Sequence, residues 1–379
     1  MNPTDFQAPS AGRVIQALGG YAAFVPAPLP PELAYPPSLV LALSRADAAL
    51  SELSGLGRQL PNPNLLIAPY VRREAVLSSR IEGTRASLSD LLLDEAETDR
   101  SQDADVREVR NYVTALEHGL ERLRELPLSL RLVRELHERL MRGVRGDQAT
   151  PGEFRRSQNW IGPAGSTPAT APYVPPPPDA MMECLADWEG FLHDRDRLPD
   201  LIQCALMHEQ FEAIHPFLDG NGRVGRLLIT LFLVERGRLP QPLLYLSDFI
   251  ESHRQDYYDR LQSVRTVGDW PDWLHFFLAG VEATARSAVR QASRLMDLRE
   301  SYRRRLSQRP NALRLVDELF ANPYLTAGRA ARVLGVTDPT ARQAIARLQT
   351  EGLLEEVTGR SWGRIYLARP ILEAIEDRG

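Results

Sequence analysis

The residues best suited to chemistry form one short segment, residues 215–226, which reads HPFLDGNGRVGR. It combines a histidine, an aspartate, several glycines and two arginines, and an apolar stretch, LLITLFLVE, follows at once. This pattern predicts a loop that runs into a helix. Gly220 and Gly222 let the main chain approach a ligand, and the free N–H groups of the first helical turn favour an anion, most naturally a phosphate.

Charged side chains in the same segment extend this prediction to a magnesium nucleotide. Arg223 and Arg226 are three residues apart, so both can direct a guanidinium fork at phosphate oxygens from the first turn. Asp219 supplies one carboxylate, and Mg²⁺ commonly takes one or two carboxylates together with substrate oxygens. All 45 basic residues of the chain are arginines, which excludes the lysine-dependent P-loop NTPases and Schiff-base aldolases.

His215 precedes Asp219 by four residues at the start of the loop. An imidazole with a pKa near working pH could take a proton from an attacking hydroxyl, so we interpret His215 as a general base. The alternative is a structural histidine that is hydrogen-bonded at the end of a buried helix. A zinc-protease motif is excluded, because the pair His208-Glu209 would need a second histidine at position 212, where the chain has Glu212.

The segment resembles the signature of the Fic family, H-P-F-x-[D/E]-G-N-G-R-x-x-R, and matches it at every specified position. The resemblance implies an all-helical core that transfers AMP from ATP, with Mg²⁺, to a hydroxyl side chain of a target protein. It implies that His215 is the base and that Asp219 binds Mg²⁺. It also implies an ATP-binding set, with an aromatic residue against adenine: Gly220, Asn221, Gly222, Arg223, Val224, Gly225, Arg226 and Tyr258. Some relatives have an asparagine that contacts adenine at the position where this chain has Arg265.

A second motif lies near the N-terminus, where residues 78–83 read SSRIEG. It resembles the inhibitory motif [S/T]-x-x-x-E-[G/N] of the Fic-associated N-terminal region, with Ser78 and Glu82 at its first two fixed positions. The four-residue spacing places both on one helix face, and Gly83 ends that helix. The resemblance implies that Glu82 pairs with Arg226 and takes the partner that the γ-phosphate of ATP needs. The alternative is an ordinary exposed salt bridge at a helix end.

Helices with apolar residues three and four apart must position these motifs. We predict them over residues 38–55, 64–81, 104–124, 128–142, 179–194, 199–213, 223–236, 247–265 and 271–297. Residues 1–37 are rich in proline, and we expect a loop that wraps the surface. Residues 157–178 combine proline, glycine and threonine, which predicts a long loop or a hairpin. By resemblance it is the Fic flap, which aligns a target by strand-like pairing, whereas a solvated linker is the alternative.

The pattern changes at Pro310. Residues 311–321, 326–335 and 338–351 predict three helices, the last with Asp338 as its N-cap, and a hairpin that turns at Thr358-Gly359 follows. This order resembles a winged helix-turn-helix. Nine arginines and nine acidic residues leave 310–379 without net charge, which argues against DNA binding. A local patch could still form from Arg342, Arg347, Arg360 and Arg364. A protein-docking role or a homodimer contact is the alternative.

The chain of 379 residues is long enough for two or three domains, which we place at 1–100, 101–298 and 299–379. The fold class that we expect is an all-α Fic core with a short β-hairpin flap and a C-terminal winged-helix (α+β) domain. The net charge is −5 and the chain has only two cysteines. Because it also lacks a long apolar run and a signal-like start, we expect a cytoplasmic protein without membrane contact.

Three functions stay open from the sequence. The first is a protein adenylyltransferase, restrained by Glu82, that modifies a Ser, Thr or Tyr hydroxyl of a target protein or of itself. The second is a hydrolase that removes AMP from modified targets, in which Glu82 orients a water. The third is a DNA-binding regulator whose Fic core senses a nucleotide. The enzyme is favoured, because every position of the catalytic signature is present.

Overall fold

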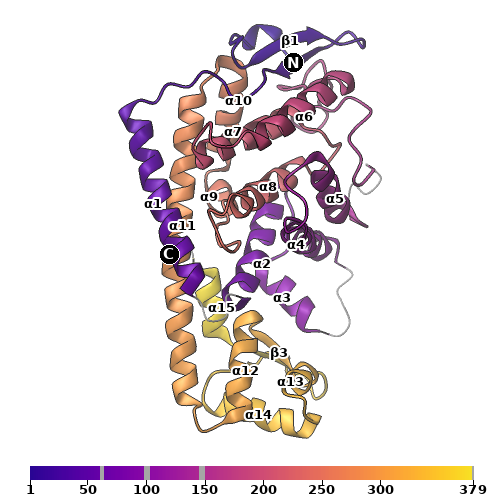
Figure 1. Ribbon diagram of the computed structural model, residues 1–379. Helices are drawn as coiled ribbons and strands as arrows, with labels where there is room; N and C mark the ends of the chain where they lie inside the picture. Colours follow the sequence, from indigo (N-terminus) through magenta and orange to yellow (C-terminus); the bar gives the residue numbers. More distant parts are fainter. Residues whose placement is uncertain (60–63, 98–102, 145–149, 378–379) are drawn as a thin grey trace.

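The computed structural model describes residues 1–59, 64–97, 103–144 and 150–377, and they form a mostly helical molecule with two small antiparallel sheets (Figure 1). The helices predicted from apolar spacing are confirmed, except that the stretch 247–265 forms two helices that break at His253. In chain order they are α1 (Pro37–Gln59), α2 (Asn64–Ile81), α4 (Ala104–Arg122), α5 (Leu130–Met141), α6 (Pro178–His193), α7 (Asp200–Ile214), α8 (Asn221–Glu235), α9 (Ser247–Ser252), α10 (Arg254–Val267) and α11 (Trp270–Arg305).

The N-terminal segment differs from the loop that its prolines predicted. After a short 3-10 turn at Pro3–Asp5, strands β1 (Gly12–Gln16) and β2 (Ala22–Pro26) form an antiparallel hairpin. The strands form here because no proline lies between Pro9 and Pro26, and the β-branched or aromatic residues Val14, Ile15, Phe24 and Val25 favour extended chain. The amide of Phe24 donates to the carbonyl of Val174 at 2.9 Å, so the hairpin braces the segment predicted as the flap.

Helices α7 and α8 carry the candidate site and lie in the middle of the molecule. Every residue of α7 from Leu201 to Ile214 is buried, which is the pattern of a helix packed on all sides. The first three turns of α8 are almost as buried, and the helix contacts α2, α4, α5 and α7. A loop held between two such helices has little freedom to move, so the sequence places its most reactive segment on rigid supports.

The long helix α11 runs the length of the molecule and packs along α1 (Figure 1). It continues to Arg305, eight residues beyond the predicted end at 297, because its arginine-rich last turns form ion pairs with the C-terminal domain. The predicted domain boundary between residues 298 and 299 therefore lies inside one continuous helix. This shared helix connects the core rigidly to the chain that follows it.

The C-terminal part has the predicted order of three helices and a hairpin, with one additional strand, β3 (Tyr324–Thr326), and one additional helix, α15 (Arg369–Glu376). Its elements are α12 (Pro310–Ala321), β3, α13 (Ala327–Leu334), α14 (Asp338–Thr350), β4 (Glu355–Glu356), β5 (Ile365–Leu367) and α15. The sheet order is β3-β5-β4, antiparallel throughout. The N-cap of α14 is Thr337 and not Asp338, which is already the first helical residue before Pro339.

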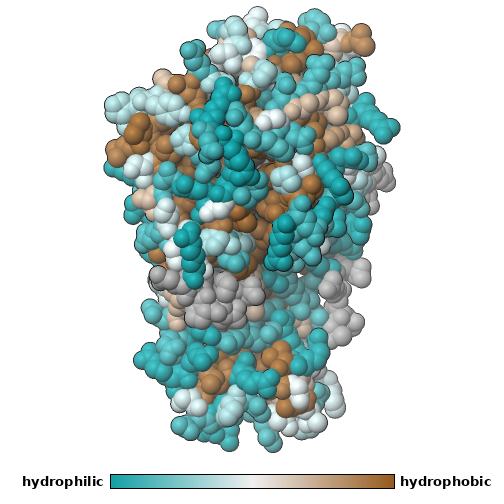
Figure 2. All heavy atoms as spheres, in the orientation of Figure 1, coloured by the Kyte–Doolittle hydropathy of each residue, from teal (hydrophilic) through white to brown (hydrophobic). Residues whose placement is uncertain are grey.

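One further helix, α3 (Leu88–Ala96), lies where the spacing predicted none, and a capping box between Ser87 and Asp90 begins it. Hydrophilic side chains cover much of the face that Figure 2 shows. Among the described residues, no helix has the combination of length and apolar character that crossing a membrane requires.

Candidate active site

The loop between α7 and α8 begins and ends with residues in the left-handed conformation. His215 has φ 49° at the end of α7, and Gly220 has φ 79° immediately before α8. A side chain at Gly220 would also lie 2.8 Å from the sulfur of Met141. The loop can therefore turn sharply into α8 only with glycine at this position.

Two asparagine side chains fix the shape of this loop. The amide of Asn221 accepts from the Phe217 N–H and donates to the Phe217 carbonyl, both at 2.8 Å. Asn159 donates to the carbonyls of Phe217 and His215 at 2.8 and 3.1 Å. The Asn221 side chain is 2% exposed, and its Oδ1 and one Nδ2–H are used within the loop. Its main-chain N–H, at the start of α8, faces the position predicted for an anion.

Arg155, which the sequence reasoning did not select, holds the loop through hydrogen bonds to main-chain carbonyls. It is 2% exposed, and its guanidinium donates to the carbonyls of His215, Pro176 and Ile214 at 2.9, 2.6 and 3.4 Å. Its own N–H donates to Pro216 at 2.9 Å. One buried arginine therefore ties the reactive loop to the end of the predicted flap.

We expect Arg155→Lys to lower both stability and transfer activity. A lysine cannot reach carbonyls on both sides of the loop, and each buried carbonyl left without a donor costs about 1–3 kcal/mol. The free energy of unfolding, measured by urea denaturation, should fall by roughly 2 kcal/mol or more. Arg156→Lys is the matched control because Arg156 is exposed. Equal stability of the two variants would contradict the supporting role of Arg155.

His137 is a second residue that the sequence reasoning missed. Gly152 donates to its Nδ1 at 2.9 Å, so Nε2 carries the proton and donates to the carbonyl of Asp219 at 3.0 Å. The ring stacks on Phe217 with 3.7 Å between centroids. Burial lowers the pKa of His137 to about 4, so the ring is neutral at pH 7, as this pair of hydrogen bonds requires.

The ring of His215 differs from a satisfied structural histidine. Its Nδ1 has no hydrogen-bond partner among the described residues, and Oε2 of Glu212 lies 4.0 Å away. Burial, together with the charges of Arg155 and Arg265, lowers the pKa of His215 to about 3. The imidazole is therefore neutral at pH 7, but its pKa lies well below the value near working pH that the sequence analysis predicted for the base. Its side chain keeps 19% of its surface exposed.

Arg265 is not placed to contact the adenine of a bound nucleotide. It is 5% exposed, forms an ion pair with the buried Glu209 at 3.2 Å, and stacks over Tyr173 at 4.3 Å. Tyr258 is 39% exposed on α10, and Arg254 lies over its ring at 5.8 Å. Burial, with the Glu82 carboxylate next in effect, raises the pKa of the Tyr258 hydroxyl. Tyr258 thus stays available for stacking, whereas Arg265 has a structural role.

Both motif arginines are buried on the first turns of α8. Arg223 is 3% exposed and lies 3.5 Å from Glu108 and 3.8 Å from Asp219. Arg226 donates to the hydroxyl and carbonyl of Ser78, each at 2.9 Å, and to Oε1 of Glu82 at 2.7 Å. The predicted pairing of Glu82 with Arg226 is thus present, and Ser78 belongs to the same contact.

Glu82 lies directly on the first turn of α8. A side-chain carbon at Gly222 would be 2.3 Å from Oε1 of Glu82, so the carboxylate fills the space that glycine leaves open. Burial alone would raise the pKa of Glu82, but the Arg226 guanidinium outweighs it and the pKa is lowered. Burial disfavours the positive charge of Arg226, but the contact with the Glu82 carboxylate outweighs burial and raises the pKa of Arg226. The predicted anion position therefore holds an ionised carboxylate of the chain itself.

Asp219 has a side chain that is 46% exposed at the loop's open side. Its Oδ1 accepts from the Gly220 N–H at 2.6 Å. Among the described residues, no group of three or more His, Cys, Asp or Glu side chains could hold a metal ion. A single exposed carboxylate fits Mg²⁺ only if substrate oxygens complete its coordination, which is the usual arrangement for this ion.

Two residues of the predicted ATP-binding set face away from the loop. The Val224 side chain is fully buried in the core, and Gly225 packs against α7, where a side chain would lie 2.5 Å from Oε1 of Glu212. A helix of 3.6 residues per turn points these positions inward when Gly222 and Arg226 point toward the loop. We therefore leave Val224 and Gly225 out of the proposed site.

The predicted flap is a long loop before α6 with one antiparallel bridge, between Ile161 and Tyr173. The hairpin expected there is thus reduced to a single pair. Tyr173 is buried and donates from its hydroxyl to the Ala213 carbonyl at 2.7 Å, which anchors the loop to α7. Most residues from Gly162 to Thr170 are exposed and have no strand partner in the described part of the chain.

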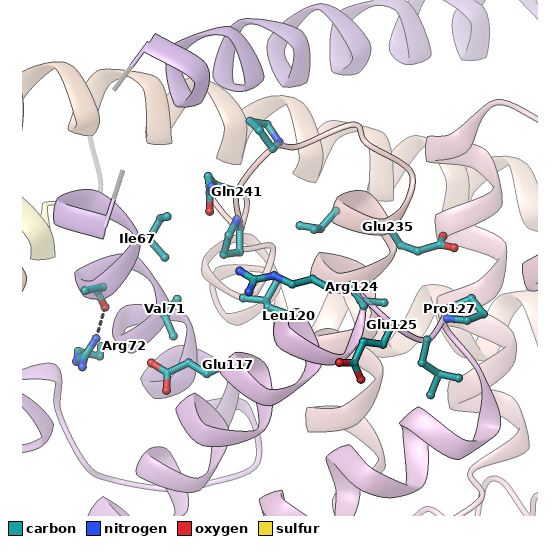
Figure 3. Close-up of a pocket in the computed structure, with 16 residues that line it drawn as sticks. Ile67, Val71, Arg72, Glu117, Leu120, Arg124, Glu125, Pro127, Glu235 and Gln241 are labelled. Carbon is teal, nitrogen blue, oxygen red and sulfur yellow. Dashed lines mark hydrogen bonds between the residues drawn. The ribbon is translucent and has the colours of Figure 1, made fainter. Parts of the chain in front are cut away.

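A separate cleft, of about 840 Å³, lies between α2, α4 and the segment after α8 (Figure 3). Its walls combine apolar side chains such as Val71 and Leu120 with charged ones such as Arg72, Glu117 and Arg124. None of residues 215–226 lines it. This cleft therefore takes no part in the chemistry of the motif.

Comparison with known proteins agrees with the signature and with the architecture. Residues 40–121 match the model for the Fic/DOC family N-terminal region, and residues 127–233 match the model for the Fic/DOC family. The chain carries Fic/DOC family domains. The second of them includes the whole loop from His215 to Arg226, and the first includes Ser78 and Glu82.

Similar proteins have been named for their activity. The chain is 31% identical over 159 residues to protein adenylyltransferase Fic of Culex quinquefasciatus, covering 41% of this chain and 28% of that protein. It is 30% identical over 174 residues to a probable protein adenylyltransferase of Aquifex aeolicus, covering 44% and 49%. The chain thus spans half or less of the length of these relatives.

A solved structure shows the same fold. The crystal structure of a Fic family protein from Desulfovibrio desulfuricans superposes with a TM-score of 0.60 at 22% identity, covering 90% of this chain and 98% of that chain. The prediction of a mostly helical Fic fold is therefore confirmed.

Proposed function

We propose that this Fic/DOC protein is a protein adenylyltransferase that transfers AMP from Mg-ATP to a hydroxyl side chain of a target protein. The hydroxyl oxygen attacks the α-phosphorus while its proton passes to the imidazole of His215. The bond from the α-phosphorus to the oxygen that bridges to the β-phosphate breaks, and pyrophosphate leaves. A new phosphodiester joins AMP to the target, so atoms and charges balance.

The observation that carries this proposal is the pairing of a neutral, unpartnered imidazole with an anion position on the next helix. His215 and the first turn of α8 are joined by only five loop residues, and Arg155, Asn159 and His137 hold that loop in shape. Arg223 and Arg226 supply fixed positive charge at the phosphates without reorganisation, which is the usual source of catalysis in such transfers. When bound through Asp219, Mg²⁺ would neutralise phosphate charge.

We further propose that Glu82 inhibits this activity. Its carboxylate contacts Arg226 at 2.7 Å and rests on Gly222, where the terminal phosphate of a nucleotide would compete for the same donors. Two negative groups cannot share that position at low cost. The resting protein would therefore bind ATP in an unproductive arrangement until Glu82 leaves.

The direct test is incubation of the full chain with Mg²⁺ and ATP labelled at the α-phosphorus, followed by mass analysis of modified residues. Transfer of AMP predicts label in protein together with release of pyrophosphate. ATP labelled at the γ-phosphorus is the control, because its label should stay in solution. Label from the γ-position in protein would indicate a kinase and would contradict the proposal.

A hydrolase that removes AMP is the second candidate, and one contact favours it. Only Oε1 of Glu82 accepts a hydrogen bond from the described residues, so Oε2 is free at a third-exposed carboxylate and could orient a water. A protein already modified with AMP is the substrate that separates the two reactions. Release of AMP by the unaltered chain and not by Glu82→Gly would favour the hydrolase.

We expect the tip of the predicted flap to select targets without affecting nucleotide binding. Replacing residues 163–170 with a short Gly-Ser linker keeps Ile161 and Tyr173, which hold the loop to the core. Binding of Mg-ATP, measured by calorimetry, should stay within about twofold, while modification of target proteins should fall by tenfold or more, because the tip is mostly exposed and has no strand partner among the described residues. Unchanged target labelling would return this segment to the role of a linker.

A further inference from the structure

A second cleft, of about 690 Å³, opens on the C-terminal domain far from His215 in the sequence. It lies between the start of α13, the first turn of α14 and the segment that joins β4 to β5. Three arginines and an exposed tryptophan line it together with two carboxylates: Arg342, Arg360, Arg364 and Trp362, with Asp338 and Glu97. Trp362 is 81% exposed, which is unusual for so large an apolar side chain.

The charges of this domain are separated in space although they sum to zero. The acidic residues are largely used in ion pairs with α11 or within the domain. These pairs are Asp317 with Arg299, Glu351 with Arg305, Asp377 with Arg294, Glu318 with Arg329, and Glu355 with Arg369. A net charge of zero for residues 310–379 therefore does not describe the charge on each part of the domain's surface.

The remaining arginines are exposed and lack such partners. No ion pair within 4.0 Å joins the guanidinium of Arg332, Arg342 or Arg347 to a carboxylate of the described residues, whereas Arg364 acts on the nearby Glu356 carboxylate and donates to the Arg360 carbonyl at 2.9 Å. Arg360 has only a loose contact, 3.9 Å from Glu97. These side chains belong to α13, α14 and the β4–β5 connection, so they surround the cleft and the outer face of α14.

We propose that this face binds double-stranded DNA. Exposed guanidiniums on two separate elements with a hollow between them fit a rigid rod with phosphates on both edges. The outer face of α14 offers Arg342, Gln343 and Arg347, side chains that pair with base edges when a helix lies in a major groove. Arg360 and Arg364 would then contact the flanking phosphates.

The test is fluorescence anisotropy of a labelled random-sequence duplex with the full chain at low salt. The double variant Arg342→Glu, Arg347→Glu should bind at least about tenfold more weakly. Arg364→Glu, at a residue assigned to a phosphate, should flatten the slope of log K against log salt by about one. Arg131→Glu, Arg286→Glu is the charge-matched control, because both arginines are exposed on other helices.

Three outcomes would overturn the proposal: no duplex binding by the unaltered chain, an equal loss in the control variant, or tighter binding to single-stranded RNA of the same length. If the double variant fails to fold, Arg364→Glu addresses the same question from the β4–β5 connection. It should weaken duplex binding in the same direction.

A different set of contacts shows what the C-terminal domain holds in place. Asn322, which is 1% exposed, donates to the Leu92 carbonyl at 2.9 Å, and the hydroxyls of Tyr324 and Ser89 are 2.5 Å apart. Leu92 and Ser89 belong to α3, which follows Glu82 by only a short turn. Helices α12 and α15 also pack directly against α2, the helix that ends at Ile81, one residue before Glu82.

We infer, on the basis of the inhibition proposed above, that the C-terminal domain clamps the inhibitory segment onto the core. This differs from the simpler expectation that a domain after residue 310 would leave catalysis unaffected. A change that loosens the seam between α3 and the domain should allow Glu82 to leave Arg226 more often. The domain would thereby connect whatever it binds to the state of the active site.

Asn322→Asp tests the clamp sharply. An aspartate keeps the acceptor that the Tyr324 N–H uses at 2.9 Å but places an oxygen against the Leu92 carbonyl, so only the seam is broken. We expect AMP transfer to rise by about twofold to tenfold, the range that one lost hydrogen bond provides. Asn311→Asp, on α12 but outside the seam, is the matched control.

The background of Glu82→Gly separates this inference from the function that it rests on. In that background Asn322→Asp should have no further effect. If Glu82→Gly itself fails to raise transfer, the proposal that Glu82 inhibits transfer is wrong. If Glu82→Gly raises transfer and Asn322→Asp does not, or if Asn322→Asp acts equally in both backgrounds, the clamp is wrong.

Discussion

Replacing His215 with alanine is expected to lower AMP transfer by about 10²–10⁴-fold, the usual contribution of a general base. The affinity for Mg-ATP should change little, because the imidazole acts on the attacking hydroxyl and contacts no phosphate in this arrangement. Burial lowers the pKa of His215 to about 3, so at pH 7 nearly every molecule holds the neutral ring that accepts a proton. No activating deprotonation is therefore needed before transfer.

The measurement is single-turnover transfer with saturating ATP, alongside calorimetry of ATP binding. His215 has φ 49°, a conformation that costs alanine more than asparagine, so His215→Asn is the second variant and separates loss of the base from loss of the turn. His275→Ala, at an exposed position on α11, controls for histidine removal in general. Substantial transfer by both His215 variants would remove this residue from the mechanism.

The contacts between motif residues that the sequence predicted depend on local spacing. Ser78 lies in the last turn of α2 and Glu82 follows directly after its end, so both reach Arg226, and Arg223 and Arg226 share the first turns of α8. The helix over 64–81 appears with the predicted bounds. In each case the deciding physics acts over a single turn of helix, and a sequence displays such distances directly.

The residues that shape the site could not be found in this way. Arg155 lies 60 residues before the carbonyl of His215 that it supports, and His137 lies 82 residues before Asp219. Their partners are main-chain carbonyls and N–H groups, which every residue has and no motif records. Asn221 shows a related limit, because its place in the signature predicts a ligand contact but gives no sign that its side chain also closes the loop through Phe217.

Replacing Glu82 with glycine is expected to raise AMP transfer and self-modification by roughly tenfold to a hundredfold. The charged hydrogen bond between Glu82 and Arg226 is worth about 1.5–3 kcal/mol, which corresponds to that bias against productive ATP. The carboxylate also leaves the space over Gly222, where its Oε1 would lie 2.3 Å from any side chain. Both effects free the first turn of α8 for phosphate.

The companion variants make this result specific. Glu82→Gln keeps the shape and removes the charge, so it should give an intermediate rise. Arg226→Ala should lower transfer, because it removes a phosphate ligand together with the inhibitory contact, and the double variant should be as inactive as Arg226→Ala alone. Initial rates of labelled AMP incorporation at matched protein concentration measure all four proteins.

The expected order of rates follows from one contact: the Arg226 guanidinium, 2% exposed, holds the carboxylate of Glu82 at 2.7 Å, and we expect the nucleotide to compete for the same guanidinium. Transfer that is unchanged or reduced in Glu82→Gly would show that the two do not compete. Transfer that rises in Arg226→Ala would show that the guanidinium restrains the enzyme by itself. Either result would separate the contact from inhibition.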